Sequence, residues 1–88
     1  MTTYYVTRSS TTAWRDEDIA MSTVRTGPFT NEGDAQVALE DAIQNEVDGL
    51  KEHNIERALA FAQLLGQVKA TGQTDVTAEG IRFQITSW

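Results

Sequence analysis

The sequence predicts an α+β domain in which a small antiparallel sheet of three to four strands carries a two-helix layer on one face, in the order ββ-αα-β(β). Three observations predict this class. The chain has 88 residues, so residues 1–88 are expected to form a single domain. Two central segments repeat apolar residues with a helical period. Near the end of the chain, residues 81–86 alternate between apolar and polar side chains, as a half-buried strand does.

The first third of the chain predicts two antiparallel strands joined by a long loop. Residues 4–7 are aromatic or β-branched, which suits a half-buried pleated sheet. Residues 9–12 are Ser and Thr and are more typical of a loop. A second strand is expected over residues 19–24, and the Gly-Pro turn signal within residues 25–28 should end it.

A capping signal precedes the clearest helix. Thr30 or Asn31 can cap it, and Phe29 can pack as a hydrophobic staple. Glu32 and Asp34 would then lie at the positive end of the helix dipole. The apolar residues that follow recur at i, i+3, i+4 and i+7, which predicts an amphipathic helix; they are Ala35, Ala38, Leu39, Ala42, Ile43, Val47 and Leu50.

A second helix is expected from about Asn54 to Lys69. Its apolar stripe consists of Ile55, Ala58, Leu59, Ala62, Leu65 and Gly66, widened by Phe61, Leu64 and Val68. Because residues 58–62 are nearly all apolar, this helix is expected to be covered on more than one side. Gly49 can separate the two segments into a hairpin, although Gly inside a helix costs only about 1 kcal/mol and one long helix is an alternative. We favour the hairpin, because one long helix would leave its wide apolar face without a partner.

Residues 81–86 give the strongest strand signal. Strict alternation places Ile81, Phe83 and Ile85 toward the helices and the residues between them toward solvent or a partner. Residues 74–77 can pair with this strand across residues 78–80, a three-residue turn in which Gly80 supplies a positive φ.

Composition excludes several classes of function. The chain has 7 Lys and Arg against 13 Asp and Glu, a net charge of −6, and no Cys. A disulfide scaffold, a Cys-based zinc site and a thiol enzyme are therefore excluded. The scattered basic residues cannot neutralise the roughly 6–10 phosphates of a typical footprint, so direct nucleic-acid binding is not expected. No apolar run is long enough for a membrane span and residues 1–8 do not resemble a signal peptide, so we expect no membrane segment and a cytoplasmic location.

No motif indicates catalysis, a cofactor or a metal. His53 is the only His, and a metal site would need three or four convergent ligands rather than His53 with Glu56. Leu50 occupies the position that a Glu-x-x-His pair requires. Residues 16–18 lack the remainder of a calcium loop, and residues 66–72 fit neither phosphate-binding glycine motif. We therefore predict a protein that is not an enzyme and uses no cofactor.

A row of carboxylates is the first feature that suggests a protein partner. If the two helices ran on continuously, the row would follow one face with neighbours about 5–6 Å apart, close to the spacing of phosphates along a nucleic acid. Such a face would imitate nucleic acid toward a basic protein. An ordinary solvated face is the simpler interpretation, and a hairpin would break the row at Gly49. The row consists of Asp41, Asp48, Glu52 and Glu56.

Two tryptophans, Trp14 and Trp88, are the second feature. Trp is frequent at interface hot spots, although either residue can instead cover an edge of a thin core. The leading hypothesis is a non-enzymatic interaction module, a regulator or inhibitor that docks on a larger basic protein such as one that handles nucleic acid. Its size and acidity are common among phage-encoded accessory proteins.

Two other hypotheses remain open. The first is a structural or assembly subunit completed by homo-oligomerisation, and a small enzyme ranks last. A homodimer is expected because of the excess apolar surface assigned to the second helix, on Ile55, Leu59, Phe61, Leu64, Leu65 and Val68.

Overall fold

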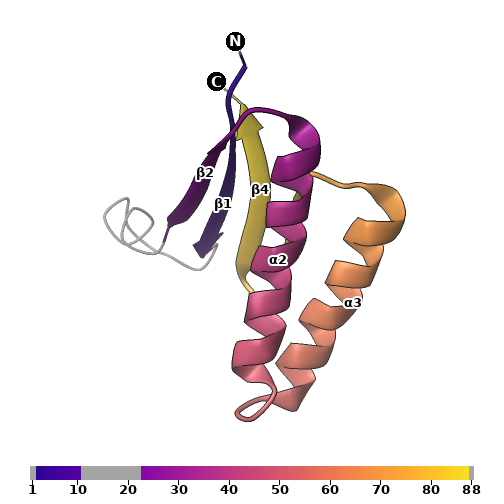
Figure 1. Ribbon diagram of the computed structural model, residues 1–88. Helices are drawn as coiled ribbons and strands as arrows, with labels where there is room; N and C mark the ends of the chain where they lie inside the picture. The colour runs from indigo at the N-terminus through magenta and orange to yellow at the C-terminus, as the bar shows by residue number, and fades with distance from the viewer. Residues whose placement is uncertain (1, 11–22, 88) are drawn as a thin grey trace.

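The computed structural model describes residues 2–10 and 23–87, which form a four-stranded antiparallel sheet with a helix pair on one face (Figure 1). This arrangement confirms the predicted class and the order ββ-αα-ββ. The strands lie side by side in the order β2-β1-β4-β3. The elements are β1 (Tyr4–Ser10), β2 (Val24–Phe29), α2 (Glu32–Leu50), α3 (Ile55–Thr71), β3 (Asp75–Ala78) and β4 (Ile81–Ser87).

The first and last strands form the centre of the sheet. β1 and β4 pair along their whole length, from Tyr4 opposite Ser87 to Ser10 opposite Ile81. α2 lies over β1, β4 and β2, and α3 packs beside α2 (Figure 1). α3 also packs against β3. The helix layer therefore covers the sheet across all four strands.

β2 differs from the predicted second strand. It runs from Val24 through Gly27 and Pro28 to Phe29, where a turn was expected, and the predicted residues 19–22 lie outside the described part of the chain. A strand at the edge of a sheet tolerates Pro, because the missing N–H does not interrupt a ladder between two neighbours. The pairing with β1 also shifts register between Tyr4 and Val6, so a bulge accommodates the Gly-Pro step, whose peptide bond is cis.

β1 is longer than the sequence indicated. Ser9 and Ser10, expected in a loop, end the strand and lie opposite Arg82 and Ile81 of β4. Pairing with a long central neighbour outweighs the weak strand propensity of Ser, since propensity is context-dependent.

The helix hairpin is confirmed, with its break later than Gly49. Gly49 lies in the last turn of α2, and a turn over residues 51–53 precedes α3. The Asn31 side chain caps α2 by accepting a hydrogen bond of 2.8 Å from the Asp34 amide. Asn54 caps α3 similarly, accepting from the Arg57 amide at 3.2 Å. The predicted apolar face of α2 is buried at Ala35, Leu39, Ile43 and Val47.

The predicted apolar stripe of α3 is only partly correct. Its buried residues are Ala58, Phe61, Leu64, Leu65 and Val68. Ile55 and Leu59 are instead 58% and 56% exposed. Cover on more than one side was expected, and among the described residues α2 and β3 both pack against α3, while Phe61 also meets Phe83 of β4. The side that carries Ile55 and Leu59 stays exposed.

The orientation of β4 is confirmed. Phe83 is fully buried, and Ile81 and Ile85 pack against the same core. The turn from β3 to β4 is shorter than expected, because Ala78 already pairs with Ile81. Glu79 and Gly80 alone make the turn, with φ of 52° and 77°.

Candidate functional site

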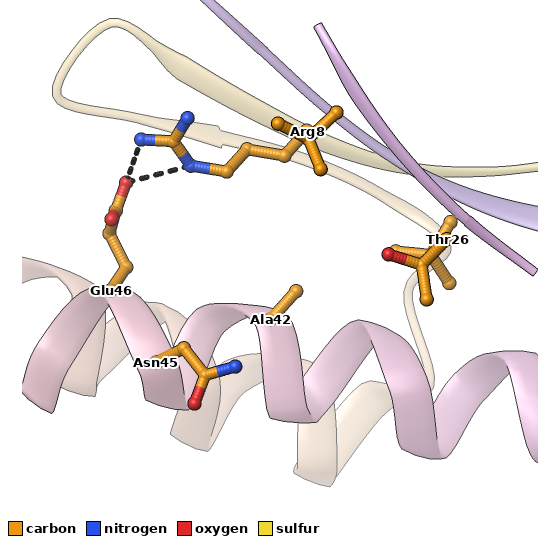
Figure 2. A pocket seen from close by; sticks show the side chains of 7 residues that line it. Arg8, Thr26, Ala42, Asn45 and Glu46 are labelled. Carbon is orange, nitrogen blue, oxygen red and sulfur yellow. Dashed lines mark hydrogen bonds and ion pairs between the residues drawn. The ribbon is translucent and has the colours of Figure 1, made fainter.

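A cavity of about 210 Å³ opens between α2 and the β1–β2 side of the sheet (Figure 2). Val6 is buried and Ala42 half-buried, so these two residues form its floor. Val24, Thr26 and Asn45 are exposed and form its mouth. The complete lining is Val6, Arg8, Val24, Thr26, Ala42, Asn45 and Glu46.

An ion pair between the sheet and α2 closes one end of this cavity. Arg8 on β1 donates from Nε to Glu46 Oε1 at 2.9 Å, and its Nη2 donates to the same oxygen. Among the described residues, none donates to the other carboxylate oxygen of Glu46. In Figure 2 the Arg8 side chain reaches over the space to Glu46, with Ala42 pointing into the space and Thr26 at the opposite end. The cavity therefore combines an apolar floor with a carboxylate oxygen that is available at one end.

This ion pair and cavity could not be predicted from local sequence patterns, because Arg8 and Glu46 are 38 residues apart. One signal was present. Arg8 continues the alternation of Tyr4 and Val6, and therefore belongs to the face of β1 that carries the helices. A charged residue on the face of a strand that the helices cover needs an oppositely charged or hydrogen-bonding partner from those helices.

α2 carries an unusual concentration of negative charge. It has no Lys, Arg or His, and among the described residues only two of its carboxylates form ion pairs. Glu46 pairs with Arg8, and the Oδ1 atom of Asp48 lies 3.2 Å from the Nζ atom of Lys51. Asp41 is exposed and pairs with no described residue. The six carboxylates of the helix are Glu32, Asp34, Glu40, Asp41, Glu46 and Asp48.

Two of the predicted partner-binding residues are helix-surface neighbours of Asn45, which lines the cavity. Asp41 and Asp48 lie four residues before and three residues after Asn45 on α2, so both are its neighbours on the helix surface. The Gln44 side chain donates to Asp48 at 3.0 Å, and this hydrogen bond together with Lys51 lowers the pKa of Asp48. Lys51 therefore offsets the charge of Asp48, and the exposed Asp41 is the carboxylate that adds negative charge beside Asn45.

The other two predicted acids lie at the hairpin. Glu52 is in the turn and Glu56 in the first turn of α3, and both are exposed. The chain reverses between them and α2, so the four acids do not form one continuous row. Instead Asp48, Glu52 and Glu56 gather around the hairpin, with Asp41 about two turns further along α2. We call these four residues the acidic face.

The remaining candidates are Trp14, Trp88 and His53. Trp14 and Trp88 lie outside the described residues, and His53 is exposed in the turn between the helices. Within residues 2–10 and 23–87, no three His, Asp or Glu side chains gather as a metal site requires. No helix in the described part of the chain is long and apolar enough to cross a membrane. No family model matches the chain, and neither a curated protein nor a solved structure matches it.

Proposed function

We propose that the chain is a non-enzymatic interaction module that binds a larger basic protein through the acidic face. The observation that carries this proposal is the acidic face itself: Asp41 and Asp48 lie on a helix without a basic residue, and Glu52 and Glu56 are exposed beyond its end. A surface of one sign attracts a partner of the opposite sign, raises the association rate and disfavours like-charged partners. A regulator or inhibitor of a basic protein is the role that such a surface suits.

The distribution of charge supports the helix side as the binding side. The strands carry Arg8, Arg25 and Arg82 against the single carboxylate of Asp75. Arg82 pairs with Asp75, and Arg25 lies 5.5 Å from the centre of the Tyr5 ring. The negative charge of the described residues is therefore concentrated on the helix layer.

Proteins that handle nucleic acid offer a suitable basic surface. Their Lys and Arg side chains are arranged to meet phosphates, and the exposed carboxylates of the acidic face present the same sign of charge. The same carboxylates repel nucleic acid itself. The proposed partner is therefore the protein and not the nucleic acid.

Assembly through a second copy of the chain is the other candidate, favoured by the exposed Ile55 and Leu59 on α3. The apolar surface available for a homodimer is smaller than the sequence indicated. Four of its six apolar residues are buried inside the chain, namely Phe61, Leu64, Leu65 and Val68. A dimer would therefore have to form around a smaller patch.

Affinity capture from the native host tests the proposed function. The baits are the wild type, Asp41→Lys and a matched control, Glu32→Lys, which makes the same charge change on α2 about 13 Å further along the helix. We expect one basic protein to be retained by the wild type and Glu32→Lys baits, released by salt, and lost from the Asp41→Lys bait. Equal retention of every protein by all three baits would contradict a role for the acidic face.

A further inference from the structure

We infer that the cavity between α2 and the β1–β2 side of the sheet is a receptor for one basic side chain, lysine or arginine, of the protein partner. This inference rests on the proposed function and deepens it, because it assigns an anchor point within a surface otherwise defined by charge. The occupant is a cationic head group on an aliphatic stem.

The shape and floor of the cavity suit an aliphatic stem. Val6, Ala42 and Val24 supply apolar surface, and the volume of about 210 Å³ accommodates a single long side chain. Lys and Arg bury their methylene groups along apolar surfaces while the charged head stays in a polar place. The exposed mouth at Val24, Thr26 and Asn45 gives a side chain from outside a direct entry.

The closed end suits a cationic head. Arg8 uses only one oxygen of the Glu46 carboxylate, so the second oxygen is available to another donor. At the mouth, away from this end, the Asn45 and Thr26 side chains supply further acceptor oxygens along the entry. A hydrogen bond from a cation to a carboxylate is roughly twice as strong as one between neutral groups.

Charge at the mouth selects a cation over a neutral or anionic occupant. The Arg8 charge is offset by Glu46, so the ion pair itself is close to neutral. Asp41, a helix-surface neighbour of Asn45, pairs with no described residue and places negative charge near the entrance. An acidic side chain would meet this charge directly, and a purely apolar one would leave the second Glu46 oxygen without a donor.

Titration of the full chain with amino-acid probes, followed by backbone amide chemical shifts, tests the inference. The probes are the N-acetyl N-methylamides of lysine, norleucine and glutamate, of which norleucine has a similar stem without the ammonium group. We expect the lysine probe to shift the amides of cavity residues saturably at millimolar concentration, and to bind about tenfold more tightly than either other probe.

Three variants make the result specific. Ala42→Leu fills the floor of the cavity without changing its charge, and it should lower the affinity for the lysine probe about tenfold. Ala62→Leu is the matched control on the exposed side of α3 and should leave the binding unchanged. Glu46→Gln should remove the preference for lysine over norleucine. Far-ultraviolet circular dichroism of each variant shows that it is folded.

Several results would overturn the inference. The first is equal affinity for the norleucine and lysine probes. The second is that Ala42→Leu leaves the affinity for the lysine probe unchanged. The third is that no probe changes the amide chemical shifts of the cavity residues. The proposed function is judged separately by the capture experiment. If capture of the partner depends on Asp41 but the lysine probe does not bind in the cavity, the proposed function stands and the assignment of the cavity as a receptor is wrong.

Discussion

The ring of Phe61 on α3 meets the ring of Phe83 on β4 edge to face, with ring centres 6.1 Å apart and planes at 83°. Both side chains are completely buried. The contact joins the helix layer to the last strand, which itself pairs along its length with the first strand. Aromatic pairs in this geometry contribute about 0.5–1.5 kcal/mol beyond the area they bury.

Phe83→Ala should therefore lower the free energy of unfolding by about 3–5 kcal/mol. The truncation leaves a cavity at the junction of helix and sheet and removes the partner of Phe61. Urea unfolding followed by circular dichroism measures the change. Val37→Ala, at a position 56% exposed on α2, is the control and should change little. A Phe83→Ala variant as stable as this control would show that the core is not centred on β4.

Gly66 within α3 and Gly72 directly after it should respond in opposite directions to substitution by Ala. A Cβ at Gly66 meets no atom within 4 Å, so Gly66→Ala should stabilise the helix by about 0.5–1 kcal/mol. Gly72 ends the helix with φ of 71°, and Gly72→Ala should destabilise by about 1 kcal/mol. Thermal unfolding of both variants measures the difference. Destabilisation by Gly66→Ala would mean that something outside the described residues packs closely on this helix.

Acid should weaken one ion pair of the open sheet face. Arg82 donates to Asp75 at 2.8 Å, and this hydrogen bond lowers the pKa of Asp75. The pair therefore contributes stability above the ordinary carboxyl range, and that contribution is lost as the pH falls through the lowered pKa. At neutral pH Asp75→Asn should cost about 0.2–1 kcal/mol, as exposed pairs do.

The difference between the wild type and Asp75→Asn should disappear once the pH falls below the pKa of Asp75 in the folded chain. Urea unfolding at pH values on both sides of this range measures it. Asp41→Asn is the control, because Asp41 pairs with no described residue. If the difference in free energy of unfolding between the wild type and Asp75→Asn is unchanged in acid, the ion pair contributes no stability through its charge.

The second candidate function predicts a dimer that depends on concentration. Ile55 and Leu59 would form its contact, so Leu59→Lys should shift sedimentation toward the monomer. Gln67→Lys, at an exposed polar position of α3, is the control. A wild-type chain that remains monomeric at high concentration would remove assembly as a function.

The sequence predicted the elements where local pattern and tertiary packing agree. Asn31 and the apolar period after it defined α2, and the alternation around Phe83 defined the inward face of β4. The prediction was wrong where packing decides. A continuous apolar run does not reveal which side of α3 is covered, and Gly27-Pro28 does not reveal that a bulged edge strand can contain it.

The candidate site likewise has a part that sequence could predict and a part that it could not. Charge and spacing alone were enough to propose Asp41 and Asp48 as candidates, since both lie on one helix. Arg8 and Glu46 come together only when β1 is placed beneath α2, and the cavity exists only between these elements. Single-sequence patterns describe neighbours within an element and not partners across layers.

The association rate with the captured basic protein, measured over a salt series, shows whether the acidic face recruits the partner. We expect the wild-type rate to fall steeply between about 50 and 500 mM salt, because screening removes the steering by the acidic face. We also expect Asp41→Lys to associate about tenfold more slowly at low salt, while Glu32→Lys, outside the acidic face, remains close to wild type. A wild-type rate that ignores salt and equals that of Asp41→Lys would contradict the claim that the acidic face recruits the partner.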